Sequence, residues 1–430
     1  MKILVIGSGA REHAFVWKLS REPGVHTILC APGNPGIAEI ARCFRADPAE
    51  PDALLALARR EHVDLTVVGP ELPLSRGVVD LFTAERQAII GPTAAAAALE
   101  SSKAFAKDFM ARQNVPTARF RICDAADVAL RAIARGEFGY PLVIKADGLA
   151  AGKGVSIADD RAAAEAVIRD VMVSRKFGAS GERVVLEEFL SGQEASYFVL
   201  AHGTSFMPLS SAQDHKRVFD DDRGPNTGGM GAFAPSPLIT ADVERRVIET
   251  IVEPVLDGMV REGHPYRGFL YVGLMLTDEG PRVVEFNVRF GDPEAQVILP
   301  MLDEDLASLL MCAANGALPS RHARFSSNVH VGVVLAAGGY PEHVETGKII
   351  SGIEAARAVR SAVVFHAGTG RQNGDLVTAG GRVLTVVGAG ATYREGIDTA
   401  YEAALKISFE GMQYRHDIGC KALIAGNPQA

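Results

Sequence analysis

Cysteine is scarce in this sequence of 430 residues, and its pattern excludes two kinds of site. The five cysteines are odd in number and lie far apart, and none of them forms a CxxC pair. We therefore expect free thiols in a reducing compartment rather than a disulfide framework or a cysteine-rich metal cluster.

Long apolar runs and basic blocks are also missing. No stretch approaches the roughly 20 apolar residues of a membrane-spanning helix, and the apolar run at residues 1–8 is too short for a signal peptide. The formal net charge is −8, which disfavours a polyanionic nucleic acid as partner. We expect a cytoplasmic protein that binds neither membranes nor nucleic acids, although small phosphates remain possible ligands at local sites.

Glycine, in contrast, is abundant, with 44 residues, and predicts many loops that bring backbone close to a ligand. Hydrophobic residues make up 47% of the chain, which is ordinary for a globular protein. A chain of this length exceeds a single hydrophobic core, so we expect several lobes.

The first hundred residues alternate strand and helix patterns. Strands are predicted at residues 2–7, 27–30, 65–68 and 88–91, with helices at residues 12–21 and 52–61. This alternation predicts an α/β lobe of the Rossmann-like kind, with a parallel sheet covered by helices on both faces.

The rest of the chain has a different pattern. Residues 142–145 and 155–158 read as two strands joined by a glycine-rich loop, and residues 269–276 and 282–290 as a hairpin. A last lobe begins near residue 328, with strands at residues 329–336 and 382–387 and a helix at residues 393–407. We predict a central α+β region followed by a small β-rich one.

A glycine turn, residues 7–9, follows the first strand and opens a helix, where free backbone N–H groups could meet a phosphate. As a dinucleotide fingerprint it fails twice, because Glu12 replaces the third glycine and no acidic residue follows the second strand. A phosphate-bearing substrate other than NAD is the better functional interpretation, and a purely structural turn is the alternative.

The loop at residues 146–154 is a candidate flap over phosphates. Its glycines and alanines lack bulky side chains, Lys153 lies at its tip, and Lys145 ends the strand before it. Neutralising charge on a transferring phosphoryl group is the main task in phosphoryl transfer. A flexible hairpin without function is the alternative.

The strand around residue 287 carries a candidate metal site. Side chains at every second position share one face, so Glu285, Asn287 and Arg289 line up, while Val284, Phe286, Val288 and Phe290 are predicted to face the core. A carboxylate beside an amide oxygen suits Mg²⁺, and an arginine can grip a carboxylate or a phosphate. An ordinary amphipathic strand is the alternative.

Two further passages are weaker signals. Glu187 and Glu188 end a strand and could hold the ribose and adenine of a nucleotide, although solvated acids are the simpler interpretation. The polar, glycine-rich passage at residues 214–231 is either a surface loop or an ordered substrate loop, and we favour the second. Asp214 and His215 are candidates for a general base.

Together these segments resemble the ATP-grasp superfamily and, within it, the phosphoribosylamine–glycine ligase (glycinamide ribonucleotide synthetase) family. The likeness covers nearly the whole chain, and its most specific piece is residues 289–294. Further matching segments are residues 7–14, 31–36, 68–71, 145–154, 213–217, 224–231, 365–369 and 380–384.

The resemblance implies three domains and a reaction. The domains are a substrate-binding one at residues 1–101, an ATP-grasp one at residues 102–327 with a flap-bearing subdomain at about 115–190, and a C-terminal one at residues 328–430. Glycine and ATP would give glycyl phosphate, which the amine of 5-phosphoribosylamine would attack, giving glycinamide ribonucleotide, ADP and phosphate in purine synthesis. A monomer or weak homodimer is expected.

The resemblance also implies roles for individual residues. Lys145, Asp214 and Arg289 would be catalytic, and Glu285 and Asn287 would hold Mg²⁺ or Mn²⁺, since residues 271–274 lack the carboxylate that many ATP-grasp enzymes have there. ATP would contact Lys103, Lys145, Gly152, Lys153, Gly154, Glu187, Glu188, Phe189, Leu190 and Glu194. The substrates would contact Gly7, Gly9, Arg11, Glu12, His13, Asp214, Lys216, Asn226, Thr227, Gly228, Arg289 and Asp292.

Three other functions are alternatives to this one. Another ATP-grasp ligase, such as a carboxylase that makes carboxyphosphate from bicarbonate, would differ in its products. A nucleotide sensor without activity would be expected to lack Lys145, Glu285 or Asn287, and all three are present. A dehydrogenase is disfavoured by Glu12.

Overall fold

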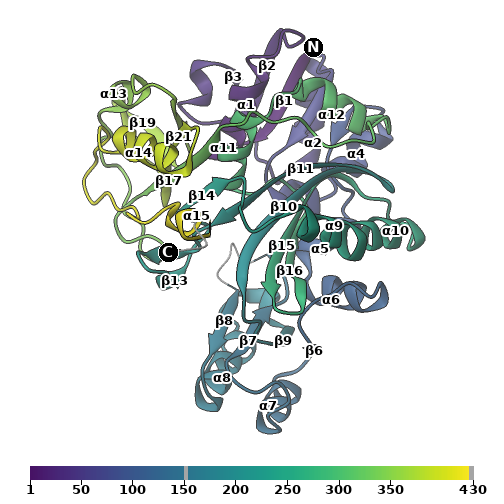
Figure 1. The fold of residues 1–430 in the computed structure, drawn as a ribbon. Helices are drawn as coiled ribbons and strands as arrows, with labels where there is room; N and C mark the ends of the chain where they lie inside the picture. Colours follow the sequence, from purple (N-terminus) through teal and green to yellow (C-terminus); the bar gives the residue numbers. More distant parts are fainter. Residues whose placement is uncertain (150–153, 426–430) are drawn as a thin grey trace.

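The N-terminal part of the chain forms a five-stranded parallel sheet. The structure is a computed structural model that describes residues 1–149 and 154–425, and Figure 1 shows its elements. The strand order is β3-β2-β1-β4-β5, and every neighbouring pair is parallel. The strands are β1 (Lys2–Gly7), β2 (Thr27–Pro32), β3 (Arg42–Cys43), β4 (Leu65–Val68) and β5 (Ile89–Ile90).

Helices cover both faces of this sheet, as predicted. Ile3 and Val5 of β1 pack in the same core as α1 (Ala10–Leu19). The alternate residues, Leu4 and Ile6, pack in a second core with α2 (Pro51–Arg60) and α4 (Val78–Ala84). Because successive side chains of a strand point to opposite faces, an entirely apolar strand requires cover on both sides.

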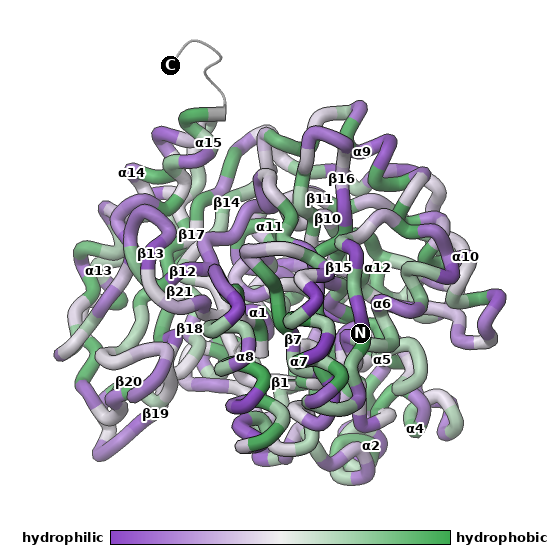
Figure 2. The backbone as a smooth tube through the Cα atoms, turned by 90° about the horizontal axis from the view of Figure 1, so that it is seen from below, coloured by the Kyte–Doolittle hydropathy of each residue, from purple (hydrophilic) through white to green (hydrophobic). Residues whose placement is uncertain are grey.

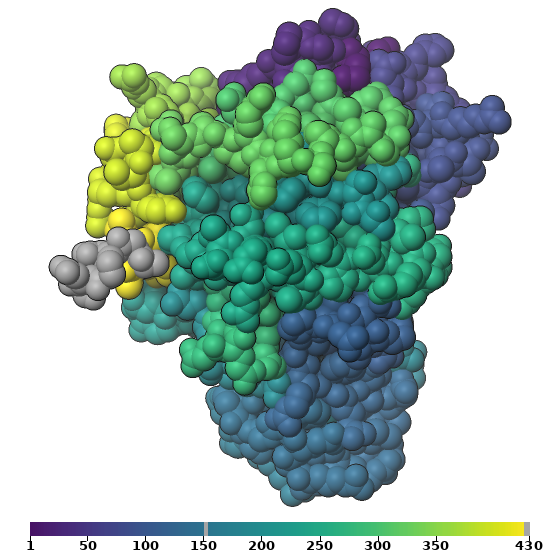
Figure 3. Space-filling model, turned by 45° about the vertical axis from the view of Figure 1, so that its right-hand side comes forward, coloured from purple at the N-terminus to yellow at the C-terminus, as the bar shows by residue number. Residues whose placement is uncertain are grey.

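A four-stranded antiparallel sheet forms a separate lobe that projects from the body of the molecule (Figures 1 and 3). Its strand order is β6-β9-β7-β8, and helices α7 and α8 share its small core. The elements are β6 (Phe120–Cys123), α7 (Ala126–Ala134), β7 (Leu142–Ala146), β8 (Val155–Ala158), α8 (Arg161–Ile168) and β9 (Val184–Glu188).

Helices α7 and α8 are amphipathic. Figure 2 shows hydrophilic and hydrophobic segments following one another along both helices. In α7, Ala129, Ala132 and Ile133 are buried, at the spacing that places residues on one helical face. Among all helices of the described part of the chain, none is long and apolar enough to cross a membrane.

An eight-stranded antiparallel sheet runs through the middle of the molecule in the order β16-β15-β10-β11-β14-β17-β21-β18. The last three strands come from the C-terminal region and extend the central sheet through β14. The predicted β-rich C-terminal region is therefore joined edge to edge to the central region. The strands are β10 (Gln193–His202), β11 (Ser205–Asp214), β14 (Gly231–Ala234), β15 (Arg267–Thr277), β16 (Gly280–Asn287), β17 (Val329–Ala336), β18 (Ala362–His366) and β21 (Arg382–Gly390).

A bulge interrupts the hairpin of β15 and β16. Gly273 of β15 pairs with Glu285, but the next residue of β15 pairs with Val283, which leaves Val284 as an extra residue. The prediction that Val284 faces the core is therefore wrong: Val283 is fully buried and Val284 only half-buried. Beyond the bulge the predicted alternation holds, and Phe286 is buried.

Candidate functional site

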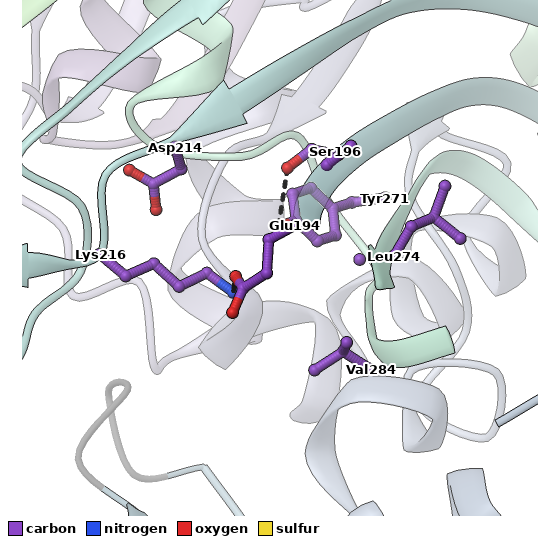
Figure 4. Close-up of a pocket in the computed structure, with 9 residues that line it drawn as sticks. Glu194, Ser196, Asp214, Lys216, Tyr271, Leu274 and Val284 are labelled. Atoms are coloured by element: carbon purple, nitrogen blue, oxygen red, sulfur yellow. Dashed lines mark hydrogen bonds and ion pairs between the residues drawn. The ribbon is translucent and has the colours of Figure 1, made fainter. Parts of the chain in front are cut away.

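A pocket opens between β10, β11, β15 and β16, and Figure 4 shows its lining. Glu194 and Lys216 approach one another across it, with an ion pair of 2.8 Å between carboxylate oxygen and Nζ. Both side chains remain partly exposed. The lining residues are Glu194, Ala195, Ser196, Asp214, Lys216, Tyr271, Gly273, Leu274 and Val284.

Glu285 lies beside this pocket and carries an ionised carboxylate. Burial on its own would raise the pKa of Glu285, but the charges of Lys216 and Lys145 outweigh burial and lower it. The carboxylate is therefore ionised at neutral pH, and it has no hydrogen-bond or ion-pair partner among residues 1–149 and 154–425. The neighbouring Asn287 Oδ1 accepts a hydrogen bond of 3.3 Å from Arg289.

A buried triad of charges lies beneath the pocket. The two carboxylate oxygens of Glu187 are 3.0 Å from Lys145 Nζ and 2.7 Å from Lys107 Nζ. Lys145 Nζ also donates to the backbone carbonyl of Val284, at 2.9 Å, so the bulge of β16 and the lysine position each other. Burial lowers the pKa of Lys107 to about 8, although Glu187 acts in the opposite direction.

The predicted nucleoside residues fall into two groups. The carboxylates of Glu187 and Glu188 are occupied by basic side chains, since Glu188 pairs with Arg119 and Arg282. That they also meet a ribose and an adenine stays a prediction. Phe189 is exposed, Leu190 is half-buried, and Glu194 lies across the pocket from Lys216.

The predicted phosphate-binding residues are described only in part. Lys103 begins helix α6 (Lys103–Arg112), and its Nζ donates to the carbonyl of Gly148 at 3.0 Å, at the start of the predicted flap. Gly154 O accepts from the backbone N–H of Ala146 at the other end of the loop. Gly152 and Lys153 lie outside the described residues.

Of the two candidate bases, only Asp214 faces the pocket (Figure 4). Burial and the charge of Glu294 raise its pKa, and its buried Oδ1 has no hydrogen-bond partner within residues 1–149 and 154–425. His215, the next residue, is fully buried against Phe233, and burial lowers its pKa to about 3. Burial therefore makes His215 a weak base, and its side chain is not among those that line the pocket, so we favour Asp214.

Arg289 is already surrounded by protein acceptors. Its Nη2 lies 3.0 Å from the carboxylate of Glu100, and its Nε lies 3.4 Å from that of Glu71. Its Nη1 donates to the carbonyl of Phe290 at 3.2 Å. The Nε–H of Arg289 is buried without a hydrogen bond among the described residues, so one donor stays available for the predicted grip on a substrate, while Nη2 also orders Asn287.

The N-terminal glycine turn is filled by Glu12. The Gly9 N–H donates to the Glu12 carboxylate at 2.6 Å, and the other carboxylate oxygen is 2.6 Å from Arg11 Nε. A Cβ at position 7 or 69 would lie within 2.5 Å of Glu12 atoms, which explains why Gly7 and Gly69 have no side chain. Because Glu12 is paired with Arg11 and accepts from the Gly9 N–H, this N–H is not free for a pyrophosphate, in agreement with the absence of a dinucleotide fingerprint.

The substrate-side residues converge from three parts of the chain. The side chain of Asp292 lies 3.5 Å from where a Cβ on Gly9 would be, and His13 Nδ1 accepts from the backbone of His366. The polar passage is ordered as a hairpin of β12 (Arg217–Phe219) and β13 (Arg223–Asn226). Thr227 bonds back to the carbonyl of Lys216 through both its N–H and its hydroxyl.

Sequence reasoning missed several charged residues near the pocket. Lys107 gives no signal in the sequence, since it is one lysine in an ordinary helix. Arg382 stood in a matching segment but was given no role, although it pairs with Asp292. Glu294, at the end of the matching segment 289–294, also has no predicted role, yet it accepts a hydrogen bond of 3.1 Å from Ser196 behind the pocket.

An antiparallel lysine-bearing lobe placed over a large antiparallel sheet, with acidic and amide groups at the sheet's edge, is the architecture of an ATP-grasp protein. Family models of phosphoribosylglycinamide synthetase match in three pieces: the N domain at residues 1–100, the ATP-grasp (A) domain at residues 101–295 and the C domain at residues 330–421. The chain belongs to the phosphoribosylglycinamide synthetase family.

Similar proteins match over the full length. A phosphoribosylamine–glycine ligase of Xanthomonas axonopodis pv. citri is 50% identical over 429 residues, covering 98% of each chain. One from Neisseria meningitidis serogroup A is 49% identical over 425 residues, covering 98% of this chain and 100% of the relative. The crystal structure of the phosphoribosylamine–glycine ligase of Thermotoga maritima has a TM-score of 0.85 at 35% identity and covers 97% of this chain and 100% of that one.

More distant structures share the fold alone. The biotin carboxylase domain of the 2-oxoglutarate carboxylase of Hydrogenobacter thermophilus is 18% identical with a TM-score of 0.73, and covers 96% of this chain and 91% of that one. Proteins with other names therefore share this fold. The fold alone does not identify the substrate, which has to be inferred from the site and from the more similar relatives.

Proposed function

We propose that this protein is a phosphoribosylamine–glycine ligase, which joins glycine to 5-phosphoribosylamine with ATP, through glycyl phosphate, in purine biosynthesis. One observation carries the proposal: relatives of this name align over 98% of the chain at about half identity, with all three family domains in order. The site geometry supports the same chemistry, because lysines converge beside an ionised carboxylate and an amide oxygen.

The chain's own cations have the arrangement that phosphoryl transfer requires. Lys145 is held by Glu187 and by the carbonyl of Val284, so its ammonium is fixed before any substrate arrives. Fixed positive charge at the transferring phosphoryl group stabilises the transition state without reorganisation. Lys103 and Lys153 are further candidates for the phosphates, and the carboxylate of Glu194 for the nucleoside.

The residues fit a divalent cation held jointly with a nucleotide. Glu285 is ionised and has no partner among the described residues, and Asn287 adds a hard oxygen next to it. In the described part of the chain no three His, Cys, Asp or Glu side chains gather as a metal cluster. Two protein oxygens suit Mg²⁺ or Mn²⁺, whose remaining positions water and phosphate oxygens can fill. Such a cation would neutralise phosphate charge.

Asp214 is the proposed proton acceptor for the attacking amine. Its carboxylate faces the pocket, and burial together with Glu294 raises its pKa toward the range in which a carboxylate can take a proton. Lys216 and Arg382 act against this shift. Once the acyl phosphate exists, the remaining work is to hold the amine in line and exclude water.

The proposed function is tested by the purified protein's substrate requirement. ADP release should need glycine, phosphoribosylamine and a divalent cation together, and glycinamide ribonucleotide should appear in equal amount. ADP release that depends on bicarbonate instead of glycine would favour a carboxyphosphate enzyme. No release with any of these acceptors would support a nucleotide sensor.

A further inference from the structure

Arg382 comes from the C-terminal region and reaches the substrate side of the site. It is the first residue of β21, and its guanidinium donates to the carbonyls of Gly228 and Gly229. The same side chain donates to the backbone carbonyl of Asp292 at 2.7 Å and is 3.3 Å from the Asp292 carboxylate. One side chain thus joins the glycine-rich passage to the acidic turn after β16.

The two segments that Arg382 joins each lie next to a residue with a proposed substrate role. Asp292 Oδ2 is 3.5 Å from the position of a Cβ on Gly9, so the acidic turn and the N-terminal glycine turn are neighbours. Gly229 lies against Asp214, whose Oδ1 is 2.7 Å from where a Cβ on Gly229 would be. A shift of either segment would therefore move Asp214 or Asp292 relative to the pocket.

A second contact from the C-terminal region acts on the same passage. The backbone N–H of Gly228 donates to the hydroxyl of Tyr340 at 3.1 Å. Gly228 is thus held at its N–H by Tyr340 and at its carbonyl by Arg382. Loops that carry substrate groups are usually mobile unless such contacts fix them. Neither contact involves the triad of Lys107, Lys145 and Glu187.

We propose that Arg382 is a positioning residue for the amine substrate, which fixes residues 228–231 and Asp292 in the arrangement that receives 5-phosphoribosylamine. The C-terminal region then contributes to substrate binding although β21 belongs to a different sheet from β7, which carries Lys145. The inference rests on the proposed function for the identity of the amine.

The test compares Arg382→Gln and Arg382→Lys with Arg371→Gln, a control at an exposed arginine of β19 (Thr369–Gln372) that donates to Gly374 O. Arg382→Gln should raise the KM for phosphoribosylamine by about tenfold or more, the effect of losing charge-assisted hydrogen bonds. The KM values for ATP and glycine should stay within about twofold. Lysine keeps the charge but not the planar fork, so Arg382→Lys should be intermediate.

A merely structural role would move all three KM values together or lower the unfolding midpoint without a selective KM effect, and either result would overturn the inference. Unchanged kinetics in both Arg382 variants would do the same. If Arg382→Gln does not fold, Tyr340→Phe carries the test, because it removes only the hydroxyl that holds Gly228 and should raise the same KM selectively. A parent protein that is inactive with these substrates would refute the proposed function itself, independently of Arg382.

Discussion

Lys145 and Glu187 form a buried ion pair of 3.0 Å directly beneath the pocket, and both side chains are about 5% exposed or less. Removal of either partner of such a pair leaves an uncompensated charge in the protein interior, which is strongly destabilising. The second lysine on Glu187, Lys107, makes the triad positive overall. A net positive charge at this place suits the phosphate-bearing ligand of the proposed function.

Lys145→Ala should reduce ATP turnover by orders of magnitude, because a lysine fixed at the transferring phosphate acts mainly in the transition state. The kcat for ADP formation and the midpoint of thermal unfolding are the two measurements. Near-normal turnover in a variant with the parent's unfolding midpoint would show that Lys145 only balances Glu187.

Glu187→Gln should destabilise the protein, since it leaves Lys107 and Lys145 facing each other without a counter-charge. We expect a loss of about 3 kcal/mol in the free energy of unfolding, typical of a broken buried ion pair. The double variant Lys107→Met/Glu187→Gln should lose less than the sum of the two single changes. Strict additivity in denaturant unfolding would contradict the triad.

Asn287→Leu should raise the Mg²⁺ concentration needed for half-maximal activity, because it removes one oxygen ligand at nearly the same volume. Asn287→Asp should be milder, since a carboxylate oxygen can replace the amide oxygen. The measurement is a Mg²⁺ titration of ADP release at saturating ATP. Titrations of both variants that coincide with the parent's would make Asn287 a strand residue without a metal role.

The fold was predictable wherever side-chain periodicity decides it. The apolar strand at residues 2–7 predicted a sheet covered on both faces, and the alternation of Phe286, Val288 and Phe290 holds. Periodicity alone could not reveal the bulge that turns Val284 out of the core, because a bulge depends on the partner strand. Nor could it reveal that β17, β21 and β18 extend the central sheet, since edge pairing between distant segments leaves no local pattern.

The candidate site was predictable where the residues of a motif lie on one strand and strand alternation fixes which face they share. Glu285 and Asn287 are half-buried and alternate with the buried Phe286 and Val288, as the strand pattern indicated, and their role as metal ligands stays a prediction. The pairing of Glu187 and Glu188 with Lys107, Lys145 and Arg119 could not be foreseen, because ion pairs between distant segments depend on tertiary packing. In the sequence, Glu12 was noticeable only because it replaces the third glycine of a dinucleotide fingerprint; that its side chain fills the glycine turn could not be predicted.

A pH effect follows from His330 on β17. Burial lowers its pKa to about 4 from an ordinary value of 6.5, so between these pH values the unfolded state binds more protons than the folded one. This contribution to stability is complete above about pH 6.5 and is lost as the pH falls toward 4.

His330→Gln, which cannot titrate, should therefore weaken the acid sensitivity. Between pH 7 and pH 5 the variant should lose about 2 kcal/mol less unfolding free energy than the parent. The same change at the exposed His26 is the control for removing a surface histidine. An identical difference between pH 7 and pH 5 in parent and His330→Gln would mean that folding does not lower the pKa of His330.

The most direct test of the central claim, activation of glycine as an acyl phosphate, follows one oxygen atom. If a glycine carboxylate oxygen attacks the γ-phosphorus and the amine later displaces phosphate, that oxygen leaves with the phosphate. Glycine labelled with ¹⁸O in its carboxylate should then deliver one labelled oxygen to inorganic phosphate in each turnover, measured by mass analysis. Adenylate activation would place the label on AMP and release pyrophosphate. Unlabelled phosphate from fully labelled glycine would contradict the proposed mechanism.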